Sequence, residues 1–198
     1  MKYIFDFDDV IFKNTSLFKV SMFSLIEKEG VSIDHAKELY NQMRIKEFSL
    51  TKFLNSLFTG KEEIIKTLYS KIMGKCPLYI NQEVIDLIKK AGKENCFLVT
   101  NGEQQFQKDK IEKSGITPLF KEIYIVPDSK REVIEKICKE NINEKIVFMD
   151  DKPKFFEDLD MNICKNLETV LYRINETKFD KKTPPCEPFE SFHRNIEK

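Results

Sequence analysis

The first clear pattern along the chain is a hydrophobic stretch interrupted by acids, "YIFDFDDVIF" at positions 3–12. Residues 2–6 have the composition of a short buried strand. From about position 16 to position 75 the apolar residues change to the 3.6-residue period of helices. The first of these stretches places Leu17, Val20, Phe23 and Ile26 at helical spacing. Further stretches follow at 33–45, 50–58 and 62–73. The pattern therefore predicts one strand and then a block of about four helices.

Beyond "KCPLY" the chain alternates between helix and strand signals. Helices are predicted at about 82–90, 104–114, 129–140 and 153–159, and each precedes a hydrophobic strand, in turn "CFLVT", "EIYIV", "KIVFMD" and "TVLYRI". Alternation of this length predicts a parallel sheet with helices on both faces. We therefore expect an α/β, Rossmann-like core formed by 1–13 and 77–178, an inserted all-helical unit at 14–76, and an extended C-terminal tail at 179–198.

Composition narrows the class of protein. Hydrophobic residues make up 41% of the 198 residues and charged residues 33%, as in an ordinary soluble domain. The 33 basic and 33 acidic side chains balance, whereas nucleic-acid and anionic-membrane surfaces usually need a basic excess. We therefore expect no nucleic-acid or membrane partner, and a monomer or weak homodimer. Five widely spaced cysteines without a C-x-x-C pair, and no secretory signal, favour reduced thiols in the cytoplasm over disulfides or zinc.

Candidate chemistry gathers where three predicted strands end. "YIF" is followed by Asp6, "FLV" by Thr100-Asn101-Gly102, and "VFM" by Asp150-Asp151. Any one of these could be a solvated turn. All three would meet at one edge of a parallel sheet, where such sheets bind ligands. Strand alternation would also place Asp6 and Asp8 on one side and Asp9 on the other.

The acidic residues suit a divalent cation and phosphoryl chemistry. Asp6, Asp8 and Asp150 offer the hard oxygen ligands that Mg²⁺ prefers, and the ion would offset repulsion among them. One carboxylate could attack phosphorus and form an aspartyl-phosphate. A second could protonate the leaving oxygen and then activate water, provided that its pKa rises from the ordinary value of about 3.9.

The remaining polar residues at this edge suit phosphate oxygens. Thr100 offers a hydroxyl, and the Asn101-Gly102 turn offers backbone N–H groups. Lys130 would add a positive charge beside a helix N-terminus.

Four motifs in this order resemble the haloacid dehalogenase (HAD) superfamily, in its Mg²⁺-dependent phosphatase branch. They are "DFDDV", "LVTNG", Lys130 within "DSKREVIEKI", and "VFMDD". The resemblance covers about residues 1–175, and the helical block resembles the family's C1 cap, which closes over the site. It implies a Mg²⁺-dependent hydrolase of a small soluble phosphorylated metabolite that works through an aspartyl-phosphate.

The resemblance also implies a role for each motif residue. Asp6 would be the nucleophile and Asp8 the general acid/base. The metal would be bound by Asp6, Asp150 and the backbone carbonyl of Asp8, with Asp151 acting through water or as a neighbouring acid. Thr100 and Lys130 would hold the phosphoryl group, although Lys108 and Lys110 lie close in sequence to the position assigned to Lys130. Asp9 departs from the family pattern, which most often has glycine there.

Three alternatives bear on the reaction. A phosphomutase shares all four motifs and differs only in the acceptor, a sugar in place of water. A non-catalytic binding module is disfavoured because every catalytic position is filled. The dehalogenases of the superfamily lack a carboxylate at the position of Asp8 and need no metal, so Asp8 and the Asp150-Asp151 pair argue against that reaction.

Substrate choice is expected to depend on the cap. The segment "MRIKEFSLTKF" resembles the family's substrate-specificity loop, where Arg44 and Lys46 could contact an anionic substrate. The alternative is that both are solvated surface charges. Phe18 and Phe23 fit the cap interior better than ligand contact.

Overall fold

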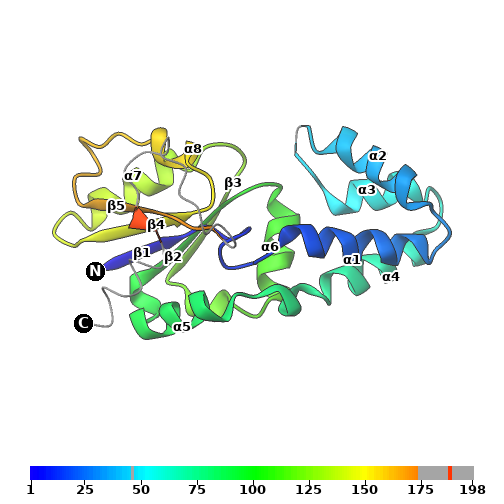
Figure 1. Cartoon of the computed structure of the whole chain (residues 1–198), viewed down its shortest axis with the longest axis horizontal. Coiled ribbons are helices and arrows are strands. Elements are labelled where there is room, and N and C mark those ends of the chain that lie inside the picture. Colours follow the sequence, from blue (N-terminus) through cyan, green and yellow to red (C-terminus); the bar gives the residue numbers. More distant parts are fainter. Residues whose placement is uncertain (46, 174–186, 189–198) are drawn as a thin grey trace.

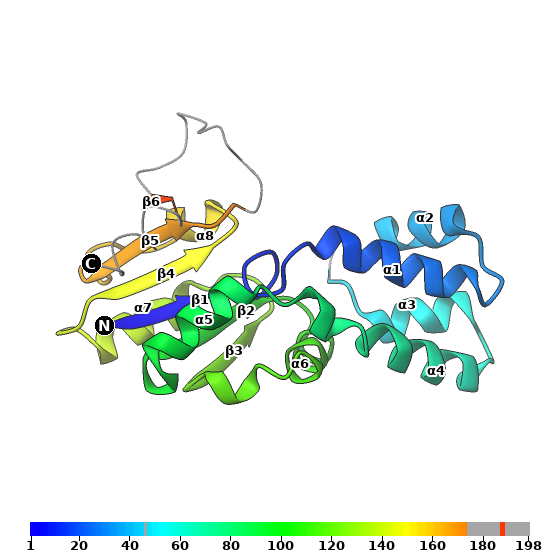
Figure 2. The same cartoon turned by 60° about the horizontal axis from the view of Figure 1, so that its bottom comes forward.

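The structure is a computed structural model, and it describes residues 1–45, 47–173 and 187–188. It divides visibly into a sheet-containing core and a group of helices beyond one end of that sheet (Figures 1 and 2). Among the described residues, no helix combines the length and the apolar character needed to cross a membrane.

The core contains a parallel sheet with strand order β3-β2-β1-β4-β5-β6. The order confirms the predicted Rossmann-like class, because the chain runs outward from β1 to β3 and then returns to the other side of β1. Of the predicted C-terminal tail, only Glu187 and Pro188 are described, and they pair with β5 as a short edge strand. The strands are β1 (Lys2–Phe5), β2 (Cys96–Asn101), β3 (Glu122–Val126), β4 (Ile146–Asp150), β5 (Leu167–Leu171) and β6 (Glu187–Pro188).

Helices cover both faces of the sheet, as the sequence predicts. Alternate strand residues enter two separate apolar clusters, because successive side chains of a strand point to opposite faces. Phe5 belongs to a cluster that includes residues of α5 (Gln82–Ala91) and α6 (Gln104–Lys113). Its neighbour Ile4 belongs to a cluster with α7 (Arg131–Glu140) and α8 (Lys154–Glu157). Short 3-10 helices occur at η1 (Cys76–Tyr79), η2 (Lys93–Asn95) and η3 (Thr117–Leu119).

Four helices follow β1, at the positions that the apolar period predicts. They lie beyond the ends toward which the strands point, and α6 lies between them and the sheet (Figure 2). Their interior is largely aromatic and aliphatic, with Phe53 fully buried. The four are α1 (Thr15–Glu27), α2 (Ile33–Met43), α3 (Leu50–Leu57) and α4 (Glu62–Met73), and we refer to them together as the cap.

The predicted stripe of α1 is confirmed at Phe23 and Ile26 and wrong at Leu17 and Val20. Leu17 and Val20 are 54% and 62% exposed, whereas the buried face contains Phe18, Met22, Phe23 and Ile26. Both sets fit a 3.6-residue period, so spacing alone does not choose between them. Packing of the aromatic ring determines that Phe18 is buried in place of Leu17, because Phe18 packs edge-on against Phe12 at a ring-centre distance of 5.2 Å. Phe18 and Phe23 are both buried, as predicted, but the Phe23 ring packs within the cap, against Tyr40, whereas the Phe18 ring packs against Phe12 and Tyr79.

Candidate active site

The ends of β1 and β4 form the centre of the candidate site. These two strands lie side by side where the strand order reverses, which is where open α/β sheets bind ligands. Phe5 pairs with Met149, and the backbone N–H of Asp6 donates to the Met149 carbonyl at 2.9 Å. Asp6 therefore begins the loop after β1 beside Asp150, the last residue of β4.

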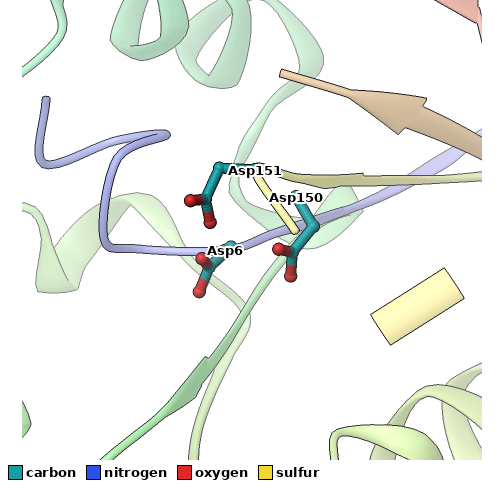
Figure 3. A group of neighbouring side chains, drawn as sticks. All are labelled: Asp6, Asp150 and Asp151. Atoms are coloured by element: carbon teal, nitrogen blue, oxygen red, sulfur yellow. The ribbon is translucent and has the colours of Figure 1, made fainter. Parts of the chain in front are cut away.

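Three carboxylates converge at this edge. Asp6, Asp150 and Asp151 each offer an oxygen, and these oxygens all lie within 4.8 Å of one another. Figure 3 shows the three side chains directed toward one common region. Asp6 and Asp150 are buried, and Asp151 is largely so.

The electrostatics of this carboxylate group are those of a site that favours a cation. Burial, together with the charge of Asp6, raises the pKa of Asp150 to about 7. Burial also raises the pKa of Asp151 to about 6, although Lys152 acts in the opposite direction. The raised pKa values mean that the charged forms of these carboxylates are disfavoured in the absence of a cation. A hard divalent cation bound to their oxygens would stabilise the charged forms.

Lys130 lies between two of these carboxylates. Its Nζ is 2.7 Å from Oδ1 of Asp6 and 2.6 Å from Oδ2 of Asp150, and the side chain is 1% exposed. The residue immediately precedes α7, and its ammonium lies 4.4 Å from the ring centre of Phe155. A buried ammonium is tolerated only with such partners. The lysine that the third motif predicts thus reaches the first and fourth motifs.

Thr100 adds a hydroxyl that the surrounding protein does not satisfy. The side chain is 1% exposed, and Oγ1 has no hydrogen-bond partner among the described residues. Buried hydroxyls are normally paired, so an orphaned one at the end of β2 suits an oxygen-rich ligand.

A comparison with protein-family models assigns these residues to a family. The model described as haloacid dehalogenase-like hydrolase matches residues 3–169, most of the chain. The chain belongs to this family. It is therefore a HAD-like hydrolase, as the four motifs predict.

Solved structures share the fold of this chain. A structure of YfnB from Bacillus subtilis, described as a HAD hydrolase bound to magnesium, has a TM-score of 0.62 at 15% identity and covers 100% of this chain and 98% of its own. A haloacid dehalogenase-like family hydrolase from Xanthomonas campestris has a TM-score of 0.56 at 14% identity, with coverage of 99% and 96%. No match was found among curated proteins.

Asp8 differs from the position that strand alternation predicts. β1 ends at Phe5, so Asp8 lies in a turn. Its carboxylate is directed to α6 and is not part of the cluster formed by Asp6, Asp150 and Asp151. It forms an ion pair with Lys110 and accepts a hydrogen bond from Nε2 of Gln107 at 2.8 Å. Burial would raise the pKa of Asp8, but the Lys110 ammonium and these hydrogen bonds outweigh it and lower the pKa.

One of the backbone donors predicted in the Asn101-Gly102 turn, the Gly102 N–H, is already bonded within the protein. The Gly102 N–H donates to the Val126 carbonyl at 2.9 Å, and the Asn101 amide donates to Pro127 and Asp128 carbonyls at 2.7 Å. In this structure these groups join the end of β2 to the loop that leads to α7, and they are not free for phosphate oxygens. Sequence reasoning recognised a polar turn, but it could not identify the partners of its donors.

Asp9 occupies the position where the family most often has glycine. Its φ of 59° lies in the left-handed region that glycine favours and aspartate tolerates. The carboxylate accepts from the backbone N–H and the hydroxyl of Thr15, at 2.9 and 2.8 Å. Asp9 therefore fixes the start of α1, and its contacts connect the loop after β1 to the cap.

The two cations predicted to contact substrate from the cap stay predictions. Arg44 is exposed, and its guanidinium lies 5.7 Å from the ring centre of Tyr40. Lys46 lies outside the described residues.

Sequence reasoning missed two further residues of α6. Gln107 and Lys110 are 5% and 3% exposed, and both contact Asp8. A signal was available, because Lys110 lies four residues after Phe106 and Gln107 four residues before Ile111, the spacing at which helical residues share a face. A lysine on the inward face of a helix indicates a buried partner.

Proposed function

We propose that the protein is a Mg²⁺-dependent phosphomonoester hydrolase acting on a small phosphorylated metabolite. The observation that carries this proposal is the convergence of Asp6, Asp150 and Asp151 at the strand edge, with the Lys130 ammonium between two of them. YfnB, a structure of the same fold, is described as bound to magnesium. Paired carboxylates, a buried cation and an unsatisfied hydroxyl together suit transfer of a phosphoryl group.

The carboxylate group fits Mg²⁺ in the number and type of its donors. Asp6 and Asp150 would bind the ion together with the backbone carbonyl of Asp8, and Asp151 would bind directly or through water. When bound, the ion would neutralise the carboxylates and withdraw electron density from the phosphoryl oxygens.

The chain's own residues would carry out the remaining work. A carboxylate oxygen of Asp6 would attack phosphorus to give an aspartyl-phosphate, releasing the alcohol. Lys130 and the Thr100 hydroxyl would stabilise the charge on the transferred group. Asp8 would give a proton to the departing oxygen, for which its carboxyl must first take up a proton against the effect of the Lys110 ammonium. It would later take a proton from the water that hydrolyses the aspartyl-phosphate.

The first test is phosphate release from phosphorylated sugars, phosphoglycolate, nucleotides and p-nitrophenyl phosphate, with Mg²⁺ or with EDTA. We expect hydrolysis with Mg²⁺ and none with EDTA. Isomerised sugar phosphate without free phosphate would indicate the phosphomutase instead. No turnover of either kind would support a non-catalytic module.

Asp6→Asn tests the nucleophile. We expect a loss of at least about 10⁴-fold in kcat, because an amide cannot form the acyl-phosphate. Asp86→Asn is the matched control, since Asp86 is exposed on α5 and its carboxylate contacts Gln82 of the same helix. Undiminished, Mg²⁺-dependent hydrolysis by Asp6→Asn would contradict the assignment.

A further inference from the structure

Lys110 is a buried cation that the proposed reaction does not use. It is 3% exposed and extends from α6 into a space bounded by the rings of Phe7, Phe12 and Phe106, whose centres lie 5.0, 4.7 and 5.2 Å from its Nζ. Lysine is rarely buried this far without a specific partner. Its ion-pair partner is the carboxylate of Asp8.

Gln107 approaches the same carboxylate from one helical turn away. Its Nε2 donates to Oδ2 of Asp8 at 2.8 Å, whereas Lys110 contacts Oδ1, so each carboxylate oxygen has its own donor. The Gln107 amide also donates to the Asn101 carbonyl at 3.2 Å. Two donors on two oxygens fix both the position and the rotation of the carboxylate.

The second motif leaves room for this contact. Gly102 has a φ of +145°, and a Cβ at that position would lie 2.9 Å from Nε2 of Gln107. A side chain at Gly102 would therefore displace the amide from Asp8. The glycine of "TNG" thus contributes space for Gln107, while its N–H is bonded within the sheet.

We propose that Lys110 and Gln107 are positioning residues that hold the Asp8 carboxylate apart from Asp6, Asp150 and Asp151. Asp8 lies only two residues after Asp6. Without these contacts, the Asp8 carboxylate would be free to approach the three clustered carboxylates or to turn to solvent. Held by α6, it stays available to the departing oxygen and the attacking water. The proposal rests on the proposed phosphatase function.

Lys110→Met is the decisive variant, because methionine keeps an unbranched apolar chain among the three rings and removes only the ammonium. We expect kcat to fall about 10- to 100-fold, the scale of a misplaced catalytic group. The inhibition constant of inorganic phosphate should change less than about threefold, since Thr100 and Lys130 are untouched. Gln107→Leu should also lower kcat, by a smaller factor, and should likewise leave the inhibition constant of phosphate nearly unchanged.

Lys108→Met is the matched control. Lys108 lies on the same helix, its side chain is 55% exposed, and its ion pair is with Glu112 at 3.9 Å. We expect wild-type kcat from this variant, and the thermal midpoints of all variants would be measured beside it.

The combination with Asp8→Asn separates positioning from a merely structural role. If Lys110 acts through Asp8, Lys110→Met should cost less than about threefold in the Asp8→Asn background, because coupled residues are not additive. A crystal structure of Lys110→Met should show the Asp8 carboxylate displaced or in several orientations. Multiplicative losses, an unchanged kcat, or an unmoved Asp8 would each overturn the proposal. Wild-type protein without Mg²⁺-dependent phosphate release would remove the proposed function itself, and this inference with it.

Discussion

The strand edge and the cap differ in where their charged side chains lie, buried at the edge and exposed in the cap. At the edge, Asp6, Asp150 and Lys130 are at most 2% exposed and face one another. In the cap, the buried side chains include Phe23, Tyr40 and Phe53, whereas the ion pairs between its described residues are at the surface, such as Lys71 with Glu29. Buried charge is costly unless it is paired, so its concentration at one edge indicates function more than stability.

α6 is one of the elements through which the two regions meet. The ring of Phe48 in the cap packs edge-on against Phe106 at a centre distance of 5.5 Å, and the Tyr69 hydroxyl of α4 donates to Asp109. The next inward residue of α6, Lys110, pairs with Asp8. One helix therefore contacts the cap on one side and a candidate catalytic residue on the other.

The largest difference between the regions should follow removal of a cation. Lys130→Met leaves two buried carboxylates without their shared partner, and we expect a loss of about 3–5 kcal/mol in the free energy of unfolding at pH 8 in EDTA. Lys71→Met in the cap should cost at most about 1 kcal/mol, because that pair is 3.5 Å apart and largely exposed. Urea denaturation measures both.

Two conditions sharpen this comparison. At pH 5 the loss in Lys130→Met should shrink, because Asp150, with its pKa raised to about 7, is already neutral there. Added Mg²⁺ should also restore part of the stability at pH 8 by binding the folded state. Equal losses in the free energy of unfolding from both lysine variants would show that the buried carboxylates do not depend on Lys130 more than a surface carboxylate depends on its partner.

The second prediction concerns the pH dependence of the metal-free protein. The pKa values of Asp150 and Asp151, about 7 and about 6, exceed those of carboxyl groups in an unfolded chain, so the folded state binds more protons. Their contribution to stability is present below about pH 4 and is lost as the pH rises through 6 and 7. We expect the thermal midpoint in EDTA to fall over this range, and Mg²⁺ to raise it more at pH 8 than at pH 5.

Asp151→Asn isolates one of these groups. It removes a charge that burial disfavours, so the metal-free variant should be more stable than wild type at pH 8 by about 1–2 kcal/mol, and equally stable at pH 4. Its gain from Mg²⁺ should be smaller. A variant less stable than wild type at pH 8 would show that the attraction between Lys152 and the Asp151 charge exceeds the cost of burying that charge.

The sequence predicted the architecture well because strand ends in a parallel sheet meet at one edge. Asp6, Thr100 and Asp150 each follow a hydrophobic run, and the structure brings them to that edge. Alternation, however, applies only within a strand. Once β1 ends at Phe5, the backbone turns through the left-handed Asp9, and no period gives the direction of Asp8.

Contacts between segments far apart in sequence were equally out of reach. The sequence indicates no partner for Lys110, because its pairing with Asp8 across 102 positions depends on how α6 packs. The prediction for the first turns of α1, at Leu17 and Val20, was wrong for a related reason, since more than one stripe fits the period and only packing chooses between them.

The smallest expected effect comes from the hydrogen bond between cap and core. Tyr69→Phe removes the hydroxyl that donates to Asp109, and burial together with that carboxylate raises the pKa of the phenol far above its ordinary value. We expect a loss of about 0.5–1.5 kcal/mol in stability, the usual net contribution of one hydrogen bond. Because Asp109 precedes Lys110, kcat should also fall slightly if α6 transmits cap position to Asp8. Tyr124→Phe, which removes a hydroxyl paired with Glu122 on β3, is the control and should leave kcat unchanged. A change in stability without any change in kcat would show that the cap contact and the Asp8 contact of α6 act independently.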